Sequence, residues 1–282
     1  MAQRTWLITG VNSGFGRLMT EQLLARGDRV LGTVRKSDAL GDLKRQYGDL
    51  LKVVHLEVTD IREIRPLVER AFADLGKIDV IVSNAGYGLF GAAEELSDEQ
   101  VSHQLATNLI GPIHLVRAAL PYLRAQGGGR IIGLSTYGGQ AAFPGGSLYH
   151  ASKWGLEGFL DSIAQELAAF KIGVTIVEPG GARTNFRFGG AQLGAPIEAY
   201  KGTPAAMVHV MMKDTTRMPP GDPAKMSTLI IESAGQEPAP RRIVLGTDSW
   251  GIIRKALAER LSAVDAQKDL AASTDISAVP LT

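Results

Sequence analysis

The sequence predicts an α/β fold in which a doubly wound parallel sheet of about seven strands carries helices on both faces. Three observations indicate this fold. Short runs rich in Val, Ile and Leu alternate with longer amphipathic stretches along the chain. The short runs are almost continuously apolar, which is typical of strands buried on both faces of a parallel sheet. Six strand and helix units follow one another without a separating linker, so we expect one domain over residues 1–282.

Four of the expected strands lie in the first part of the chain. They are TWLIT (5–9), RVLGTV (29–34), LKVVHLEV (51–58) and DVIVS (79–83). Apolar residues at helical spacing predict helices at about 15–27 and 62–75. Pro66 is tolerated in the second of these helices only near its first turn, because proline lacks the N–H that a helix interior needs.

The second part of the chain continues this alternation. Its elements are a helical stretch around 97–125, strand RIIGLS (130–135), a helix around 150–170 and strand GVTIVE (173–178). The core is completed by a helix near 222–234, strand RRIVLG (241–246) and a helix near 250–265. The polar tail KDLAASTDISAVPLT (268–282) is expected to be frayed.

One segment departs from the pattern. Residues 186–221 are rich in Gly, Pro and Met and contain no strong strand, so we expect a substrate-binding lid there. Its methionines fit a flexible cover over an apolar substrate, or the packing of a short helix, equally well.

Composition excludes several classes of protein. Lys plus Arg (30) nearly balances Asp plus Glu (29), so we expect neither nucleic acid nor a membrane surface as a partner. The chain has no cysteine, and its five histidines lack metal-ligand spacing, so no metal site is expected. No apolar run reaches the roughly 18–20 residues of a membrane span. The N-terminus leaves no room for a signal peptide, and we expect a cytoplasmic protein.

The turn TGVNSGFG (9–16) joins the first expected strand to the first helix. In a doubly wound sheet this turn lies beneath the phosphates of a dinucleotide, where glycines admit the backbone and the helix N-terminus offers N–H groups. Its glycines, Gly10, Gly14 and Gly16, do not follow the common G-x-G-x-x-G spacing. A plain turn with helix-capping glycines is the alternative.

The end of the second strand bears on the choice of cofactor. An acidic residue there would bind the ribose 2′-hydroxyl of NAD, but the sequence reads Val34-Arg35-Lys36. The planar guanidinium of Arg35 is suited to a 2′-phosphate. NADP(H) is therefore favoured and NAD(H) stays possible, with a solvated basic turn as the alternative to either.

The stretch SLYHASKWG (147–155) contains the one Tyr-x-x-x-Lys of the chain. At positions i and i+4 of a helix, Tyr149 and Lys153 share a face. The ammonium is expected to lower the pKa of the tyrosine toward the range of an acid/base catalyst, although a plain surface pair is the alternative. His150 would point about 100° away and is expected on the helix surface. Trp154 fits internal packing or an oligomer interface.

These motifs, in this order, resemble those of the short-chain dehydrogenases/reductases, in the branch with the TGxxxGxG turn and YxxxK pair. The chain looks most similar to hydroxysteroid dehydrogenase-like members. The resemblance is firm over about residues 5–185 and rests on TGVNSGFG (9–16), SNAG (83–86), Asn108 in TNLIG, Tyr149 with Lys153, and PGGART (179–184). It implies a Rossmann-type fold and a homodimer or homotetramer.

The resemblance also implies roles for individual residues. Tyr149 would exchange a proton with the substrate oxygen, Lys153 would hold the ribose hydroxyls, and Asn108 would anchor a water of the proton relay. The remaining implied cofactor contacts are Gly10, Asn12, Ser13, Gly14, Phe15, Gly16, Arg35, Glu57, Val58, Asn84, Ala85, Gly86, Pro179, Gly180 and Thr184. Glu57 stands where the family usually has Asp, and for Asn84 a strand-stabilising role is equally expected.

The catalytic serine of the family lies 13 residues before the tyrosine, and Thr136 occupies that position here. Neighbouring residues of a strand point to opposite faces, so Ser135 and Thr136 are not expected to reach the same substrate oxygen unless the strand has already ended. We expect Thr136 to contact the substrate and Ser135 to be structural. The alternative is that Thr136 caps the strand end and Ser135 takes its place.

The predicted function is hydride transfer between NADP(H) and a small apolar ketone, aldehyde or alcohol. A catalytically impaired NADP(H)-binding redox sensor is the alternative, because of the threonine at the serine position. An enoyl reductase is disfavoured, since that branch spaces its tyrosine and lysine more widely.

Overall fold

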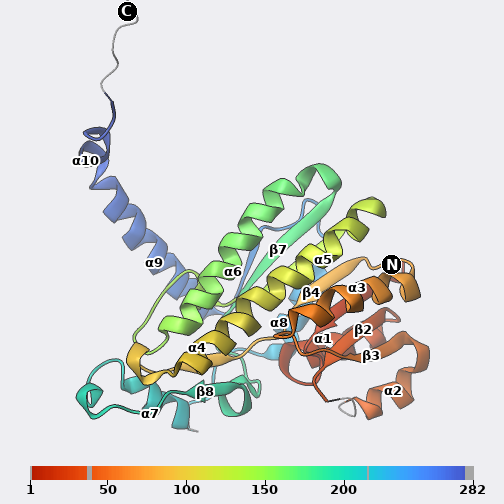
Figure 1. Ribbon diagram of the computed structural model, residues 1–282, viewed down its shortest axis with the longest axis horizontal. Coiled ribbons are helices and arrows are strands. Elements are labelled where there is room, and N and C mark those ends of the chain that lie inside the picture. Colours follow the sequence, from red (N-terminus) through yellow and green to blue (C-terminus); the bar gives the residue numbers. More distant parts are fainter. Residues whose placement is uncertain (1, 37–39, 215, 277–282) are drawn as a thin grey trace, which may run out of the picture.

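A seven-stranded sheet, in which all strand pairs are parallel, forms the centre of the molecule in the computed structural model (Figure 1). The structure describes residues 2–36, 40–214 and 216–276. In spatial order the strands are β3 (Leu51–His55), β2 (Arg29–Val34), β1 (Thr5–Thr9), β4 (Val80–Ser83), β6 (Gly129–Leu134), β7 (Ile172–Pro179) and β9 (Arg242–Leu245). This confirms the predicted doubly wound α/β fold.

Helices cover both faces of the sheet, and the alternation of strand side chains assigns each helix to a face. In β1, Leu7 faces a cluster formed with α3 (Ile61–Leu75), α5 (Gly111–Ala125) and α6 (Ser147–Glu166). Trp6 and Ile8 face the other cluster. That cluster is formed with α1 (Gly14–Ala25), α2 (Gly41–Tyr47) and α8 (Pro223–Ser233).

The strand order reverses beside β1. The chain runs outward from β1 to β2 and β3, and then returns to β4 on the other side of β1. In such sheets the crevice at the carboxyl ends of the strands, at the point of reversal, is where ligands bind. Thr9 and Ser83 end the two strands that flank this crevice.

Several element boundaries differ from the predictions. The third strand ends at His55 and not at 58, so Glu57 and Val58 lie beyond it. Helix α2 was not predicted. Pro66 lies in the second turn of α3 and not near the first, and its missing N–H removes one intrahelical hydrogen bond there. The stretch 97–125 divides into α4 (Asp98–Leu105), a π-helical turn (Ala106–Ile110) and α5.

Two segments are more ordered than the sequence indicates. A second, two-stranded sheet pairs β5 (Gly88–Phe90) with β8 (Ala191–Leu193), so residues 186–221, predicted to hold no strong strand, contain one short strand of three residues. Backbone pairing with distant β5 creates β8, which no local pattern reveals. The same segment contains the short helix α7 (Met207–Lys213).

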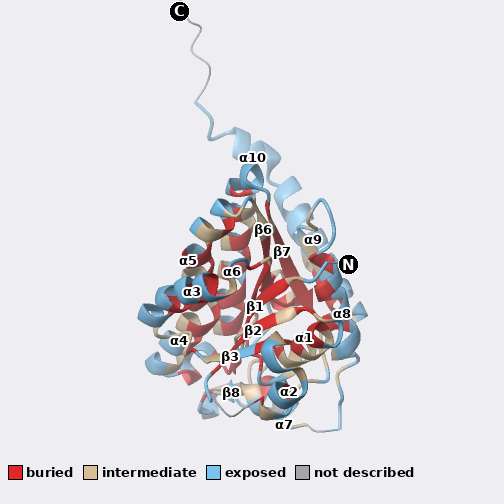
Figure 2. Ribbon diagram, turned by 90° about the vertical axis from the view of Figure 1, so that its right-hand side faces the viewer, coloured by how far each residue is buried: buried red, intermediate tan, exposed pale blue. Residues whose placement is uncertain are grey.

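The end of the chain forms two helices, α9 (Thr247–Asp265) and α10 (Lys268–Ala272). The expectation of a fully frayed tail is therefore wrong for Lys268–Ala272, while residues 277–282 lie outside the described part. Both helices project from the body of the molecule (Figures 1 and 2). Within the described residues, no helix combines the length and apolarity that a membrane span requires.

Candidate active site

A cavity of ≈700 Å³ lies at the carboxyl ends of the central strands. Apart from Gly16 and Asn108, every residue predicted for the site lines it. These lining residues are Gly10, Asn12, Ser13, Gly14, Phe15, Arg35, Glu57, Val58, Asn84, Ala85, Gly86, Thr136, Tyr149, Lys153, Pro179, Gly180 and Thr184. The fold thus brings together motifs that are spread over 175 positions of the sequence.

The glycine turn has the geometry of a phosphate cradle. Gly10 and Gly14 have φ angles of 73° and 54°, which favour glycine. A Cβ at Gly16 would lie 2.2 Å from the carbonyl oxygen of Gly10, so no side chain fits at that position. Helix α1 begins at Gly14, and Ser13 caps it without a side-chain hydrogen bond. The N–H groups of its first turn are available to an anion, and the residues fit a dinucleotide.

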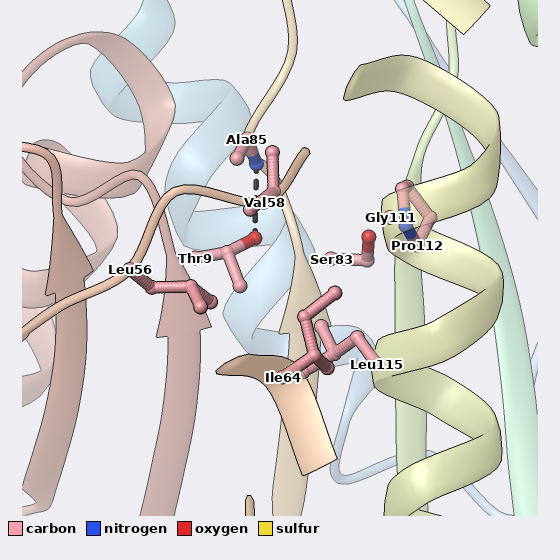
Figure 3. A pocket seen from close by; sticks show the side chains of 9 residues that line it. All are labelled: Thr9, Leu56, Val58, Ile64, Ser83, Ala85, Gly111, Pro112 and Leu115. Atoms are coloured by element: carbon pink, nitrogen blue, oxygen red, sulfur yellow. Dashed lines mark hydrogen bonds between the residues drawn. The ribbon is translucent and has the colours of Figure 1, made fainter. Parts of the chain in front are cut away.

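Asn84 and Thr9 hold this turn against strand β4. The side-chain amide of Asn84 donates to the carbonyl oxygens of Thr9 and Gly10, at 2.8 and 3.1 Å. The Thr9 hydroxyl accepts from the backbone N–H groups of Asn84 and Ala85, both at 3.0 Å. Figure 3 shows the second of these bonds. Thr9, Ala85 and Val58 also line a small void of ≈10 Å³. The strand-stabilising role expected for Asn84 is therefore present in the structure.

At the far side of the turn, Arg35 follows the end of β2 and lines the cavity. It is exposed. Arg17 of α1 is paired with Glu21 at 2.7 Å and with Asp42 at 2.5 Å. The Glu57 carboxylate accepts from the backbone N–H of Thr59 at 3.3 Å.

Helix α6 places Tyr149 and Lys153 one turn apart, and both are buried. The Lys153 ammonium donates to the carbonyl oxygen of Leu134 at 2.7 Å. Burial lowers the pKa of Lys153 to about 8, and the nearby Glu157 opposes this shift. Lys153 therefore remains mostly protonated at pH 7.

The pKa of Tyr149 differs from the expectation. Burial raises it above the ordinary value, the nearby Tyr137 adds to the rise, and hydrogen bonding with Thr136 opposes it. The direction is opposite to the lowered pKa that the sequence predicted for Tyr149, because loss of hydration on burial is the largest influence on the phenol. At neutral pH the phenol keeps its proton.

Ser135 and Thr136 both lie beyond β6, which ends at Leu134, so strand alternation does not decide between them, but their hydroxyls have different partners. The Thr136 hydroxyl donates to the carbonyl oxygen of Pro179 at 3.3 Å. The Ser135 hydroxyl donates to the Glu157 carboxylate. Both residues line the cavity, and Thr136 is the one that shifts the pKa of Tyr149.

Asn108 lies in the π-helical turn and is fully buried. Its amide nitrogen donates to the carbonyl oxygen of Tyr87 at 2.8 Å and to the Ser152 hydroxyl at 3.2 Å, and its oxygen accepts from the Tyr87 N–H at 3.1 Å. Ser152 in turn donates to the carbonyl oxygen of Tyr149 at 2.7 Å. The side chain of Asn108 therefore links Tyr87, the residue before β5, to the helix of Tyr149. Ser152 was not predicted, because a serine inside a helix carries no specific signal.

An apolar wall adjoins Tyr149. The centroid of the Tyr149 ring lies 5.3 Å from that of the Phe90 ring in β5 and 5.9 Å from that of the Phe186 ring. Val208 of α7 is buried in the same cluster, and Met212 packs against it. The methionine content of this segment indicated such a wall, but nothing in the sequence singled out Phe90 or Phe186.

A buried charged cluster lies behind Ser135. Glu157, on α6 one turn after Lys153, accepts from the side chains of Ser135, Gln140 and Arg242. The guanidinium of Arg242 also donates to Glu178 at 2.6 Å. Burial and the nearby Glu157 raise the pKa of Glu178 to about 7. The cluster joins α6, β7 and β9. The sequence shows only that Glu157 lies four residues after Lys153 and does not show that it meets Arg242.

His150 is not on the helix surface as predicted. It is 4% exposed, and its ring meets the Phe143 ring edge-on with centroids 4.1 Å apart. Neither ring nitrogen has a hydrogen-bond partner among the described residues. Burial lowers the pKa of His150 to about 4. The prediction failed because the segment around Phe143 covers this side of α6, which helical periodicity alone does not reveal.

Trp154 is 41% exposed, and the Arg260 guanidinium of α9 lies 4.8 Å from the centre of its ring. The described residues contain no group of three or more His, Asp or Glu side chains arranged to hold a metal ion.

Comparisons with known proteins agree with this geometry. A profile of the short chain dehydrogenase family matches residues 4–189. Oxidoreductase BOA17 of Botryotinia fuckeliana (strain B05.10) is 34% identical over 93% of this chain and 95% of that protein. The crystal structure of a short-chain dehydrogenase from Streptomyces avermitilis has a TM-score of 0.90 and 35% identity, and the match covers 98% of this chain and 100% of that chain.

A metagenomic short-chain oxidoreductase in complex with NADP has the same fold, with a TM-score of 0.68 and 24% identity over 86% of this chain and 96% of that chain. The family profile covers well over half of the chain, and the first two relatives span nearly all of it. The chain belongs to the short-chain dehydrogenase family of oxidoreductases.

Proposed function

We propose that the protein transfers a hydride between NADP(H) and an apolar carbonyl or alcohol, with Tyr149 as the acid/base group. One observation carries the proposal. The buried Tyr149 hydroxyl lies in the same cavity as the glycine turn, between Thr136 and an apolar wall. One end of the cavity therefore fits a dinucleotide phosphate, and the other fits an uncharged substrate.

In this mechanism a bound nicotinamide cofactor supplies or accepts the hydride. Tyr149 is protonated at neutral pH because burial raises its pKa, so it is ready to donate a proton to a carbonyl oxygen. The Thr136 hydroxyl would turn from Pro179 to the same substrate oxygen. Lys153, a buried cation one turn from Tyr149, would exchange Leu134 for the ribose hydroxyls. In alcohol oxidation the proton moves in the opposite direction.

The choice of NADP(H) is supported by Arg35, which lines the cavity where a carboxylate would favour NAD(H). A guanidinium binds a phosphate through two parallel hydrogen bonds. NAD(H) stays a possible cofactor, and kinetics with both nucleotides decide between them.

The substrate is proposed to be apolar because Phe90, Phe186, Val208 and Met212 surround Tyr149. Phe186, Val208 and Met212 belong to residues 186–221, which supports a role for this segment as the lid. Such a wall excludes water from the reacting oxygen and buries hydrocarbon. Hydroxysteroids therefore belong in the first panel of candidate substrates, beside aliphatic and aromatic ketones and aldehydes.

The test is NADPH oxidation with this panel, for the wild type and for Tyr149→Phe. We expect turnover with at least one apolar carbonyl, and a loss of at least about a hundredfold in the variant. NADPH binding, followed by nucleotide fluorescence, should be nearly unchanged. Tyr122→Phe, which alters a tyrosine stacked on Phe72 away from the site, is the matched control. Equal turnover by wild type and Tyr149→Phe would refute the assignment.

A redox sensor is the second candidate. Thr136 stands where the family has its catalytic serine, and its hydroxyl donates to the carbonyl oxygen of Pro179 in this structure, which motivates this candidate. Tight NADPH binding without turnover over the whole panel would support the sensor and reject the enzyme.

A further inference from the structure

Helix α9 is attached to the body of the protein mainly through its first turns. The Ser249 hydroxyl donates to the carbonyl oxygen of Glu178 at 2.8 Å, and Asp248 accepts from the N–H of Gly181 at 2.7 Å. Of the 19 residues of α9, only Ser249 and Ile253 are buried. Beyond this, Arg260 reaches back to the carbonyl oxygen of Gln140. The rest of the helix projects away from the body, as Figures 1 and 2 show.

The projecting part of α9 carries large apolar side chains on one side. Trp250, Leu257, Leu261 and Val264 are 59%, 46%, 62% and 65% exposed, and we call them the α9 stripe. With 3.6 residues per turn, they fall within an arc of about 60°. Together with buried Ile253 they follow steps of three and four residues, which is the spacing of a coiled-coil seam. A solvated helix normally shows polar residues on such a face.

The stripe is about as long as a helix-pairing surface needs to be. Nineteen residues span about 28 Å, and the stripe runs along most of that length. Single exposed apolar residues are common, but a continuous row of them marks an interaction site. An isolated helix of this length is also only marginally stable in water, so a partner would stabilise it.

The charges beside the stripe indicate what the partner is. Arg254 in the first half of α9 and Asp265 at its end lie on the same flank of the stripe. When two identical helices pair in opposite directions, residues of the same flank face each other. Arg254 of one copy then lies beside Asp265 of the other, twice, and Leu257 packs on Leu261. In a parallel pair, Arg254 would lie at the level of the second Arg254 and Asp265 at the level of the second Asp265, so the pairing of opposite charges would be lost.

We propose that the α9 stripe is the docking surface for a second copy of this chain, whose α9 packs against it in antiparallel orientation. The surface is self-complementary, because one helix supplies both members of the charge pair, as a two-fold interface requires. This interface is distinct from the catalytic cavity and does not depend on which substrate is used.

The first test measures the mass of the purified full-length protein by light scattering at micromolar concentration. The double variant Leu257→Lys/Leu261→Lys should halve the mass of the wild type. Ile252→Lys is the matched control, since Ile252 is an exposed apolar residue of the same helix roughly 150° away from the stripe. Its mass should equal that of the wild type. A monomeric wild type, an unchanged mass of the double variant, or a halved mass of the control would overturn the proposal.

Exchanging the two charges distinguishes loss of association from misfolding of a variant. Arg254→Asp and Asp265→Arg should each weaken association at least about threefold, and Arg254→Asp combined with Asp265→Arg should restore it. A combined variant that associates more weakly than either single one contradicts an antiparallel pair of identical helices. The melting temperatures of all variants, measured in parallel, should stay close to one another because these side chains are exposed.

Cross-linking determines the orientation directly, since the chain has no cysteine of its own. A mixture of the Arg254→Cys and Asp265→Cys proteins should form a disulfide between the two species under mild oxidation. Each protein alone should form far less. Efficient cross-linking of Arg254→Cys with itself would bring two copies of position 254 together, which the proposed antiparallel pair does not allow, and would reject the proposal, as would the absence of any cross-link.

Discussion

Helices α6 and α9 have nearly the same length but opposite surroundings. Of the 20 residues of α6, eight are buried, and they include Tyr149, Lys153 and Glu157. Of the 19 residues of α9, two are buried, and its large apolar side chains other than Ile253 are exposed. One helix thus carries polar groups into the core, and the other carries apolar groups into solvent.

The difference shows that both helices break the usual amphipathic rule, for different reasons. Polar groups in the core cost free energy unless they are paired. In α6 they are paired with distant strands, as when Glu157 binds Arg242 and Lys153 binds Leu134. In α9 the cost lies in apolar surface left in water, which a second copy of the chain would cover.

The largest expected difference between the two helices is in stability. Leu160 of α6 is fully buried, so Leu160→Ala should lower the free energy of unfolding by about 2–5 kcal/mol. Leu261→Ala on α9 should change it by less than about 0.5 kcal/mol in the dissociated protein. Chemical denaturation at low protein concentration measures both. Equal losses would mean that α9 packs on the body, and the comparison would fail.

Substitutions beside Tyr149 of α6 should lower the catalytic rate more than substitutions that leave this tyrosine untouched. Thr136→Val keeps the shape but removes the hydroxyl beside Tyr149, and we expect kcat to fall about a hundredfold. Ser135→Ala, which breaks only the contact with Glu157, should cost far less. Steady-state kinetics on the best substrate compare the two. A reversal of the two effects would assign the substrate contact to Ser135.

Burial of α6 predicts a pH dependence that α9 does not share. The pKa of His150 is lowered to about 4, so the unfolded chain binds a proton at a higher pH than the folded one. The stability contributed by neutral His150 is present above about pH 6.5 and is lost as the pH falls through about 4. The free energy of unfolding should decline there by on the order of 1–3 kcal/mol.

The variant His150→Leu should flatten this decline, because leucine has no proton to bind. Glu259→Gln, on the exposed part of α9, is the control and should leave the shape of the curve unchanged. Denaturant unfolding at several pH values measures the effect. A curve for His150→Leu with the wild-type slope would show that another group causes the acid sensitivity.

The smallest expected effect concerns cofactor binding at Arg35, which is distant in sequence from Tyr149 and Lys153 of α6. Arg35→Ala should raise the KM for NADPH about tenfold and leave the KM for NADH and kcat nearly unchanged, because only NADPH carries the 2′-phosphate. Equal changes for both nucleotides would refute this role of Arg35.

The main elements of the fold were predictable because their signals are local. Strands β1, β2 and β4 are nearly continuous apolar runs, and the glycines of the turn after β1 are needed for its backbone geometry. The spacing of Tyr149 and Lys153 places both on one side of α6, whatever surrounds that helix. These features, taken in order along the chain, were also sufficient to indicate the family.

The sequence by itself therefore determined the main sheet, most of the helices that cover it and most of the predicted residues that meet at the carboxyl ends of the strands. Tertiary structure decided the rest: the pairing of β5 with β8, the apolar wall of Phe90 and Phe186, the burial of His150, the raised pKa of Tyr149 and the projection of α9. The physical reason is that hydration and packing depend on neighbours far away in the chain. Periodicity shows which side of a helix is apolar, but only the folded chain shows what covers it.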